Sequence, residues 1–346
     1  MAKRITVVVS QGQSQNPAKR GLEEDIVAEL LMESGVDVVV IPNLYDLKPD
    51  GTGMLALQGI SGNMIVCSWL FERAAHWILD RNSILGQVGE TMIQRQDDDD
   101  EDLENELEEE VDKERVIEQR QIPNRKIYCI DLRIHNTARP YIEEVKRIAN
   151  ENSAQVVELM SWISGSPKPE QTEQYLSANS PTNGNGHQAT RIEEEPVRRW
   201  YPVIDFSRCT NCMECIDFCL FGVYGVDNAE TILVEQPDNC RKGCPACSRV
   251  CPENAIIFPQ HKTPAIAGSA EVSAGLKIDL SQLFGAPTEG KSAEEIATAE
   301  RDEQLVLAGR EAVGMTIGVP KRQDNKANEP KDELDDLIDE LDELDL

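Results

Sequence analysis

The chain has 346 residues, which is enough for two folded domains with connecting segments. Its formal net charge of −29 disfavours binding to nucleic acid, whose phosphates attract Lys and Arg. No run approaches the roughly 20 apolar residues that a membrane span needs. The apolar run Ile5–Val9 is too short for a secretory signal and is typical of a first strand.

The region from residue 5 to about 160 alternates strand-like and helix-like segments. Apolar, β-branched runs predict buried parallel strands, and these are Ile5–Val9, Val36–Ile41, Met64–Cys67 and Lys126–Leu132. Helical periodicity predicts helices over Gly21–Ser34, Glu72–Asp80, Pro140–Asn150 and Ser153–Ser164. This alternation favours an α/β fold, with an open parallel sheet, helices on both faces and a flavodoxin-like strand order.

In open α/β sheets, ligands bind outside the carboxyl ends of the strands. Three loops are expected at that edge: Ser10–Pro17, Asn43–Asp46 and Cys67–Trp69. The first is polar and precedes a helix, so its amides could hold an anion, but an ordinary connection is the better interpretation. Neither a phosphate-binding loop nor a dinucleotide fingerprint is present.

Four side chains of this region are weak site candidates. Cys67 closes a strand before a helix, where a thiolate would be stabilised, but a small buried side chain is the simpler interpretation. Cys129 lies inside its strand and is expected in the core. His76 is interpreted as structural, and His135, which follows Asp131 at a strand end, as a slightly better candidate.

Two acidic runs hold much of the charge. Twelve acids and no Lys or Arg lie between Asp97 and Asp112, and nine more lie between Asp332 and Leu346. Such runs are typical of solvated, disordered segments. We therefore predict an α/β domain over residues 1–165 with an acidic insert at 96–120. A Pro-, Ser-, Asn- and Gly-rich linker at 166–196 is then expected to let the following region move.

Eight of the ten cysteines lie in two runs. The first is C-x2-C-x2-C-x3-C and contains Cys209, Cys212, Cys215 and Cys219. The second is C-x3-C-x2-C-x3-C-P and contains Cys240, Cys244, Cys247 and Cys251. Closely spaced thiolates need a metal to offset their repulsion. Iron–sulfur clusters fit this spacing, while structural zinc usually takes separated pairs and disulfides between such near neighbours are strained.

The segment from 197 to 262 resembles the bacterial-type two-cluster ferredoxins. Each half reads strand, cysteine loop, short helix, strand, with strands at Val203–Asp205, Gly222–Tyr224, Ile232–Val234 and Ala255–Phe258. The resemblance implies an α+β ferredoxin-type domain with two [4Fe–4S] clusters, the fourth cysteine of each run starting a helix and reaching the other cluster. One cluster would then take Cys209, Cys212, Cys215 and Cys251. The other would take Cys240, Cys244, Cys247 and Cys219.

Two departures from that family concern the loops. Leu220 stands where proline usually follows the first run, and the interval from Cys240 to Cys244 has one extra residue, near Gly243. Neither departure removes a ligand. Apolar side chains are expected to shield the clusters, and these are Ile216, Phe218, Phe221, Val250 and Ile256, with Trp200 and Tyr201 from the entering strand.

Residues 263–346 are expected to form a spacer, a helix over Ala293–Val313 and an acidic amphipathic tail. Leu334, Leu337 and Leu341 recur at helical spacing in that tail, which predicts either docking on a partner protein or a disordered end.

The resemblance implies a protein that carries single electrons between unidentified redox partners, in a reducing cytoplasm. An alternative is an oxidoreductase whose α/β domain binds a flavin, nucleotide or substrate that the clusters reduce. A third class is a structural cluster protein whose iron does not cycle. Bound flavin or nucleotide would favour the second class, and resistance of the clusters to dithionite would favour the third.

Overall fold

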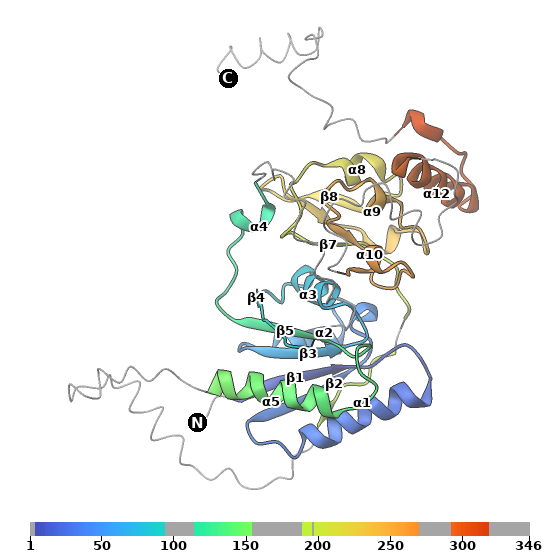
Figure 1. Cartoon of the computed structure of the whole chain (residues 1–346). Helices are drawn as coiled ribbons and strands as arrows, with labels where there is room; N and C mark the ends of the chain where they lie inside the picture. Colours follow the sequence, from blue (N-terminus) through green and yellow to red (C-terminus); the bar gives the residue numbers. More distant parts are fainter. Residues whose placement is uncertain (1–3, 94–113, 154–188, 196, 270–291, 318–346) are drawn as a thin grey trace, which may run out of the picture.

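The computed structural model describes residues 4–93, 114–153, 189–195, 197–269 and 292–317. Its centre is a parallel sheet of order β4-β5-β3-β1-β2-β6 (Figure 1). The strands are β1 (Ile5–Ser10), β2 (Val36–Ile41), β3 (Met64–Ser68), β4 (Gln87–Val88), β5 (Lys126–Asp131) and β6 (Thr190–Arg191). The four long strands were all predicted. Across the sheet the four long strands lie in the order β2-β1-β3-β5. Numbered by their place in the chain this is 2-1-3-4, which is the flavodoxin-like order.

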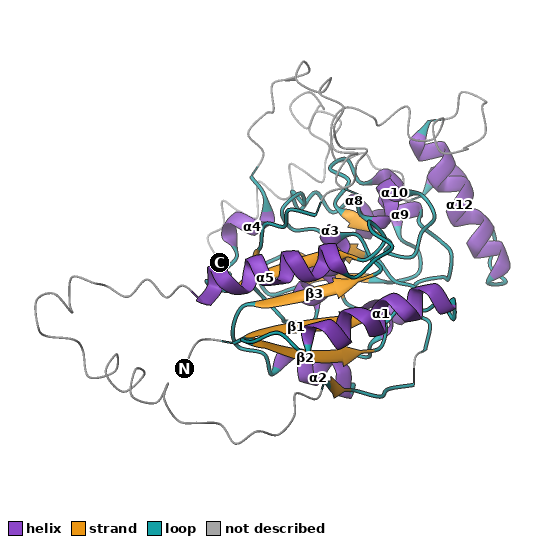
Figure 2. Cartoon of the chain, turned by 60° about the horizontal axis from the view of Figure 1, so that its bottom comes forward, coloured by secondary structure: helices purple, strands orange, loops and turns teal. Residues whose placement is uncertain are grey.

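Helices cover both faces of the sheet. One face carries α1 (Pro17–Leu30) and α5 (Arg139–Ser153), which lie side by side in Figure 2. The other carries α2 (Thr52–Gln58) and α3 (Glu72–Arg81). The first helix begins at residue 17, earlier than predicted, because Asn16 accepts a hydrogen bond from the Ala18 amide and Pro17 occupies the first turn. Most of the second helix predicted after α5 lies outside the described residues.

The cysteine-rich half contains two small antiparallel sheets. In one, β7 (Val203–Ile204) pairs with β10 (Ile256–Ile257), and in the other β8 (Tyr224–Val226) pairs with β9 (Ile232–Val234). The short helices between them are α8 (Glu214–Phe218) and α9 (Ala246–Val250). This strand–loop–helix–strand repeat matches the predicted one.

The two halves share a hydrophobic core. Tyr201, Val203 and Ile257 pack with Tyr45 and with residues of α3 in one cluster of buried side chains. The rings of Tyr45 and Tyr201 stack with centroids 4.3 Å apart. The α/β part is therefore packed against the cysteine-rich part on the α3 face of the sheet, and the expected movement on a tether does not describe this arrangement (Figure 1).

The segments predicted as linker and as acidic insert contain short elements of regular structure. The linker was placed at 166–196, but Thr190 and Arg191 form β6 beside β2, and the Ile192 amide donates to the Val40 carbonyl at 2.9 Å. The acidic insert was placed at 96–120, but its end forms α4 (Val116–Gln119). The unpaired edge of β2 and the loop of the cysteine-rich half supply the hydrogen bonds that order these segments.

After the repeat, the chain adds α10 (Pro264–Ala267) and α12 (Ala293–Leu307). Ser292 and Glu295 form a reciprocal capping box that starts α12, and this helix ends before the predicted Val313. The acidic tail lies outside the described residues. In the described ranges, no helix has the length and apolar character that crossing a bilayer requires.

Candidate metal centre

The eight cysteines lie around α8 and α9. Cys215 and Cys247 lie within these helices, while Cys219 and Cys251 are the residues that follow their last turns. The prediction that the fourth cysteine starts a helix is therefore wrong. The chain turns into extended geometry at both positions, which directs the fourth thiol of each run away from its own loop.

Left-handed backbone residues occur at equivalent places in the two halves. Asn211 (φ 58°) and Gly243 (φ 87°) each precede the second cysteine of a run, and Gly222 (φ 68°) and Asn254 (φ 48°) each follow the fourth by three residues. Asn and Gly tolerate this conformation best. Gly243 thus takes the place of Asn211, and the extra residue of the second loop lies between Cys240 and Gly243.

The first set of thiols combines both runs. Burial raises the pKa of Cys215, and the neighbouring thiols of Cys251, Cys209 and Cys212 raise it further. Burial also raises the pKa of Cys209 to about 11, with added contributions from Cys251 and Cys212. Because such interactions need short separations, Cys251 lies with the three cysteines of the first loop.

The second set lines a small cavity. Cys240, Cys244 and Cys247 line it together with Cys219 from the first run. Burial raises the pKa of Cys247, and Cys219, Cys240 and Cys244 raise it further. The fold thus brings Cys219 to the second loop, as it brings Cys251 to the first.

Several donors point at the sulfurs. The Asn211 amide lies 3.5 Å from Cys209 Sγ, the Ala255 amide 3.2 Å from Cys251 Sγ, and the Tyr224 hydroxyl 3.0 Å from Cys247 Sγ. Such bonds favour the charged thiolate and tune the reduction potential of a cluster.

The predicted apolar shield is present in part. Ile216, Phe221 and Ile256 pack around the cysteines of both sets, and Phe218 and Val250 pack with Cys244. Trp200 stacks on Phe258 with centroids 5.3 Å apart and donates to the Cys244 carbonyl at 3.2 Å. Tyr201 instead lies in the core shared with the α/β part.

The donor chemistry of both sets fits an iron–sulfur cluster, since each set consists of thiols in a largely apolar shell. Across the described ranges, no three His, Cys, Asp or Glu side chains converge closely enough to hold one metal ion.

An ion pair between α3 and the first cysteine loop was not predicted. Arg73 Nε donates to Asp205, whose carboxylate is 1% exposed. The Asp205 carbonyl accepts from the Cys209 amide at 2.9 Å, and Arg73 Nη2 donates to the Asn254 carbonyl at 2.5 Å. Arg73 thereby links the two segments that carry Cys209 and Cys251, which are 42 positions apart in the chain.

The end of the acidic insert touches the same loop. The Val116 amide donates to the Cys209 carbonyl at 2.9 Å, and the Ile117 amide to the Phe206 carbonyl at 3.0 Å. The only sequence signal was the apolar pair Val116–Ile117 beyond the acidic run, and a signal that short is not specific.

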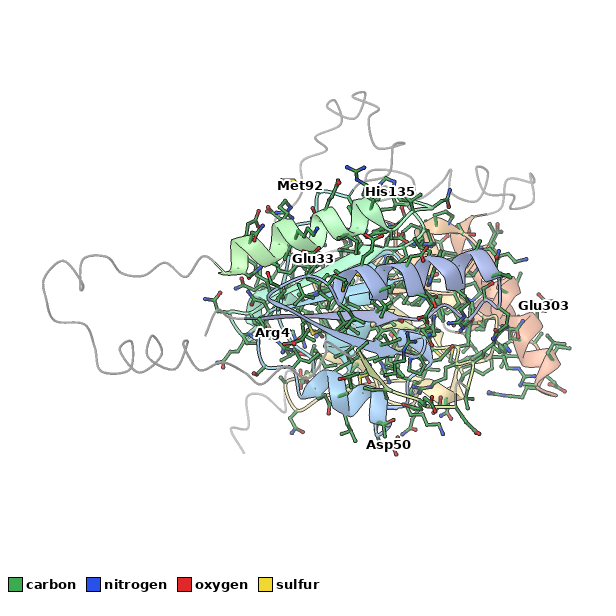
Figure 3. All side chains as sticks on the ribbon, turned by 90° about the horizontal axis from the view of Figure 1, so that it is seen from below. Arg4, Glu33, Asp50, Met92, His135 and Glu303 are labelled. Atoms are coloured by element: carbon green, nitrogen blue, oxygen red, sulfur yellow. The ribbon has the colours of Figure 1, made fainter. Side chains whose placement is uncertain are left out.

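The weak candidates of the α/β part lie apart from the cysteine sets. Burial raises the pKa of Cys67 to about 12, so this thiol is protonated and inert at neutral pH. Cys129 is likewise buried. His76 is buried in the helix α3. His135 lies near the start of α5, and its backbone amide donates to the Tyr141 hydroxyl at 2.7 Å (Figure 3).

An acidic side chain of the protein occupies the start of the loop after β1. Glu23, 2% exposed, accepts from the Gly12 amide and from Trp69 Nε1, both at 2.7 Å. A carboxylate of the protein itself thus occupies the place where a phosphate could have been held. Beside it, an open hollow of about 600 Å³ is lined by Gln, Asn, Arg and several acids, among them Asp46 and Glu193.

Comparison with known proteins places the similarity in the iron–sulfur class. A protein of Methanocaldococcus jannaschii named as an uncharacterized ferredoxin is 52% identical to this chain over 66 residues. The match covers 19% of this chain and 44% of the ferredoxin, so the chain spans less than half the length of that relative. No family model and no solved structure matches the chain. A ferredoxin-like segment is thus supported, and nothing assigns the α/β part.

Proposed function

We propose that the chain is an electron-transfer protein that holds two [4Fe–4S] clusters. The first set, Cys209, Cys212, Cys215 and Cys251, would hold one cluster, and Cys219, Cys240, Cys244 and Cys247 would hold the other. When bound, each cluster gains and loses single electrons. The observation that carries the proposal is the exchange of the fourth cysteine between the two runs.

The residues of the chain have three tasks in this proposal. Amides and the Tyr224 hydroxyl donate to the sulfurs and stabilise their charge. Apolar neighbours such as Phe218 exclude water from the space between the thiols. The α/β part, through Arg73, holds the first loop in place.

The same proposal makes residues 1–153 and 189–195 a platform that docks redox partners rather than a catalyst. Glu23 supports this assignment because its buried carboxylate would repel the phosphate of a flavin or nucleotide at the loop after β1. The cysteine-rich domain would extend from 197 to 269, since α10 packs on β10 and on α3.

The test is anaerobic purification followed by iron and sulfide analysis and EPR of the dithionite-reduced protein. About eight irons per chain are expected, because each cluster contains four. Zinc without acid-labile sulfide would contradict the proposal, and clusters that dithionite cannot reduce would favour a structural role.

Serine substitutions test the exchange of ligands. Cys219→Ser should alter the same EPR signal as Cys244→Ser, and Cys251→Ser the same signal as Cys212→Ser. Cys67→Ser is the matched control, since this buried cysteine lies in the α/β part and should leave both signals unchanged. If Cys219→Ser and Cys212→Ser altered one common signal, the assignment of the fourth ligands would be wrong.

A further inference from the structure

Arg301 on α12 is a buried charge, 1% exposed. The helix α12 packs against α9, where Arg249 pairs with Glu300 at 2.8 Å. Burying a guanidinium is costly unless its donors are satisfied. Here Nη1 donates to the Ile317 carbonyl and Nη2 to the Gly314 carbonyl, both at 2.6 Å. The chain after α12 therefore holds this side chain in one position.

The side chain faces the second set of cysteines. Arg301 lines the same cavity as Cys219, Cys240, Cys244 and Cys247. Its guanidinium carbon lies 4.6 Å from the centre of the Phe218 ring, which also lines this cavity.

The buried charges beside the two sets differ. Near the first set, the carboxylate of Asp205 pairs with Arg73, and Arg208 Nε lies 3.8 Å from it. The second set has the Arg301 guanidinium in its cavity, and the Tyr224 hydroxyl lies 3.0 Å from Cys247 Sγ. Asp302, the next residue on α12, pairs with Arg301 Nε at 3.2 Å.

We propose that Arg301 raises the reduction potential of the cluster held by the second set above that of the first. Reduction adds one negative charge, and a positive charge held in a buried, apolar site stabilises it. In a singly reduced molecule the electron then resides mainly on the cluster beside α12. This inference rests on the proposed function and makes Arg301 a tuning residue rather than a ligand.

The test is an anaerobic redox titration monitored by EPR, with the signal of the second set identified through Cys244→Ser. Arg301→Gln should lower the equilibrium constant for one-electron reduction of the second cluster at least tenfold, which corresponds to a reduction potential lower by about 59 mV. The equilibrium constant for reduction of the first cluster should change less than twofold. Arg301→Lys, which keeps the charge, should restore most of the loss.

Two further variants separate charge from folding. Asp302→Asn removes the negative partner of Arg301 and should raise the reduction potential of the second cluster. Glu303→Gln makes the same change of net charge at an exposed position of α12 and should move neither signal (Figure 3). If the Arg301→Gln protein does not retain the second cluster, the Asp302→Asn variant tests the inference. A higher potential of the second cluster supports it, and an unchanged or lower potential overturns it.

The outcomes distinguish this inference from the proposed function. A protein without reducible iron–sulfur signals would overturn both. Two reducible clusters whose potentials respond to neither Arg301→Gln nor Asp302→Asn would overturn the role of Arg301 alone.

Discussion

Substituting Arg73 by Gln should weaken the attachment of the first cysteine loop to the α/β part. The Arg73 and Asp205 side chains are 11% and 1% exposed, and breaking a buried ion pair costs about 3–5 kcal/mol because one charge stays buried without its partner. Arg208 Nε lies 3.8 Å from the same carboxylate and compensates in part. We therefore expect a loss of about 3 kcal/mol, or roughly a hundredfold in the unfolding equilibrium.

The location of the effect is a stricter test than its size. Arg73 contacts the segments of Cys209 and Cys251, so the first set should lose iron before the second. The assay is anaerobic urea unfolding followed by tryptophan fluorescence, since Trp77 packs edge-on against Phe206 across the shared core at 5.8 Å. EPR of partly unfolded samples would show which cluster disappears.

The matched control is Arg139→Gln, which removes an exposed ion pair with Glu143 on α5. Exposed pairs contribute little, so this variant should unfold like the unmodified protein. The reasoning would be refuted if Arg73→Gln matched this control, or if its second cluster were lost first.

Two predictions concern buried groups of the α/β part. With a pKa of about 12, Cys67 should be thiolate in only about one molecule in ten thousand at pH 8. Iodoacetamide should therefore label it, by mass spectrometry, only after unfolding, and labelling of the folded protein at the rate of a free thiol would contradict the burial. Burial, assisted by Arg120 and opposed by Asp205, lowers the pKa of His76 to about 4. Below about pH 6.5 the unfolded chain therefore binds a proton at His76 that the folded chain does not bind. The free energy of unfolding is retained above that pH and falls by about 2 kcal/mol between pH 7 and pH 5. Denaturant unfolding should show this slope in the unmodified protein and a shallower one in His76→Gln, and equal slopes would mean that His76 is not the group responsible.

Elements with a strong local pattern were predicted well. The run Lys126–Leu132 became the strand β5, which lacks only the last predicted residue, and Glu72–Asp80 became α3 with one added residue. Apolar periodicity depends only on neighbouring residues, and it indicates which side of a helix or strand is buried.

Elements ordered by distant partners were not predicted. The strand β6 has two residues and exists because β2 offers an open edge. The helix α4 is ordered by hydrogen bonds to the loop of Cys209. Short segments like these carry too little pattern of their own, so their structure depends on contacts that are remote in the chain.

For the candidate metal centre, one prediction agrees with the structure and one does not. The resemblance to two-cluster ferredoxins implied which thiols would meet. In the structure, Cys219 lines a cavity with the cysteines of the second loop, and Cys251 lies near those of the first. The expected helix start at the fourth cysteine was wrong, because both residues lie just after the last turn of a helix.

By itself the order of residues determined the parallel sheet and the repeat of the cysteine-rich half, because both depend on patterns that span only a few neighbouring residues. Only the tertiary structure decided that the two halves share a core, that Arg73 joins the segments of the first set, and that Arg301 is buried beside the second. Lone arginines in a chain with 34 Lys and Arg residues have no local pattern, and their role depends on which distant groups the fold brings within a few ångströms.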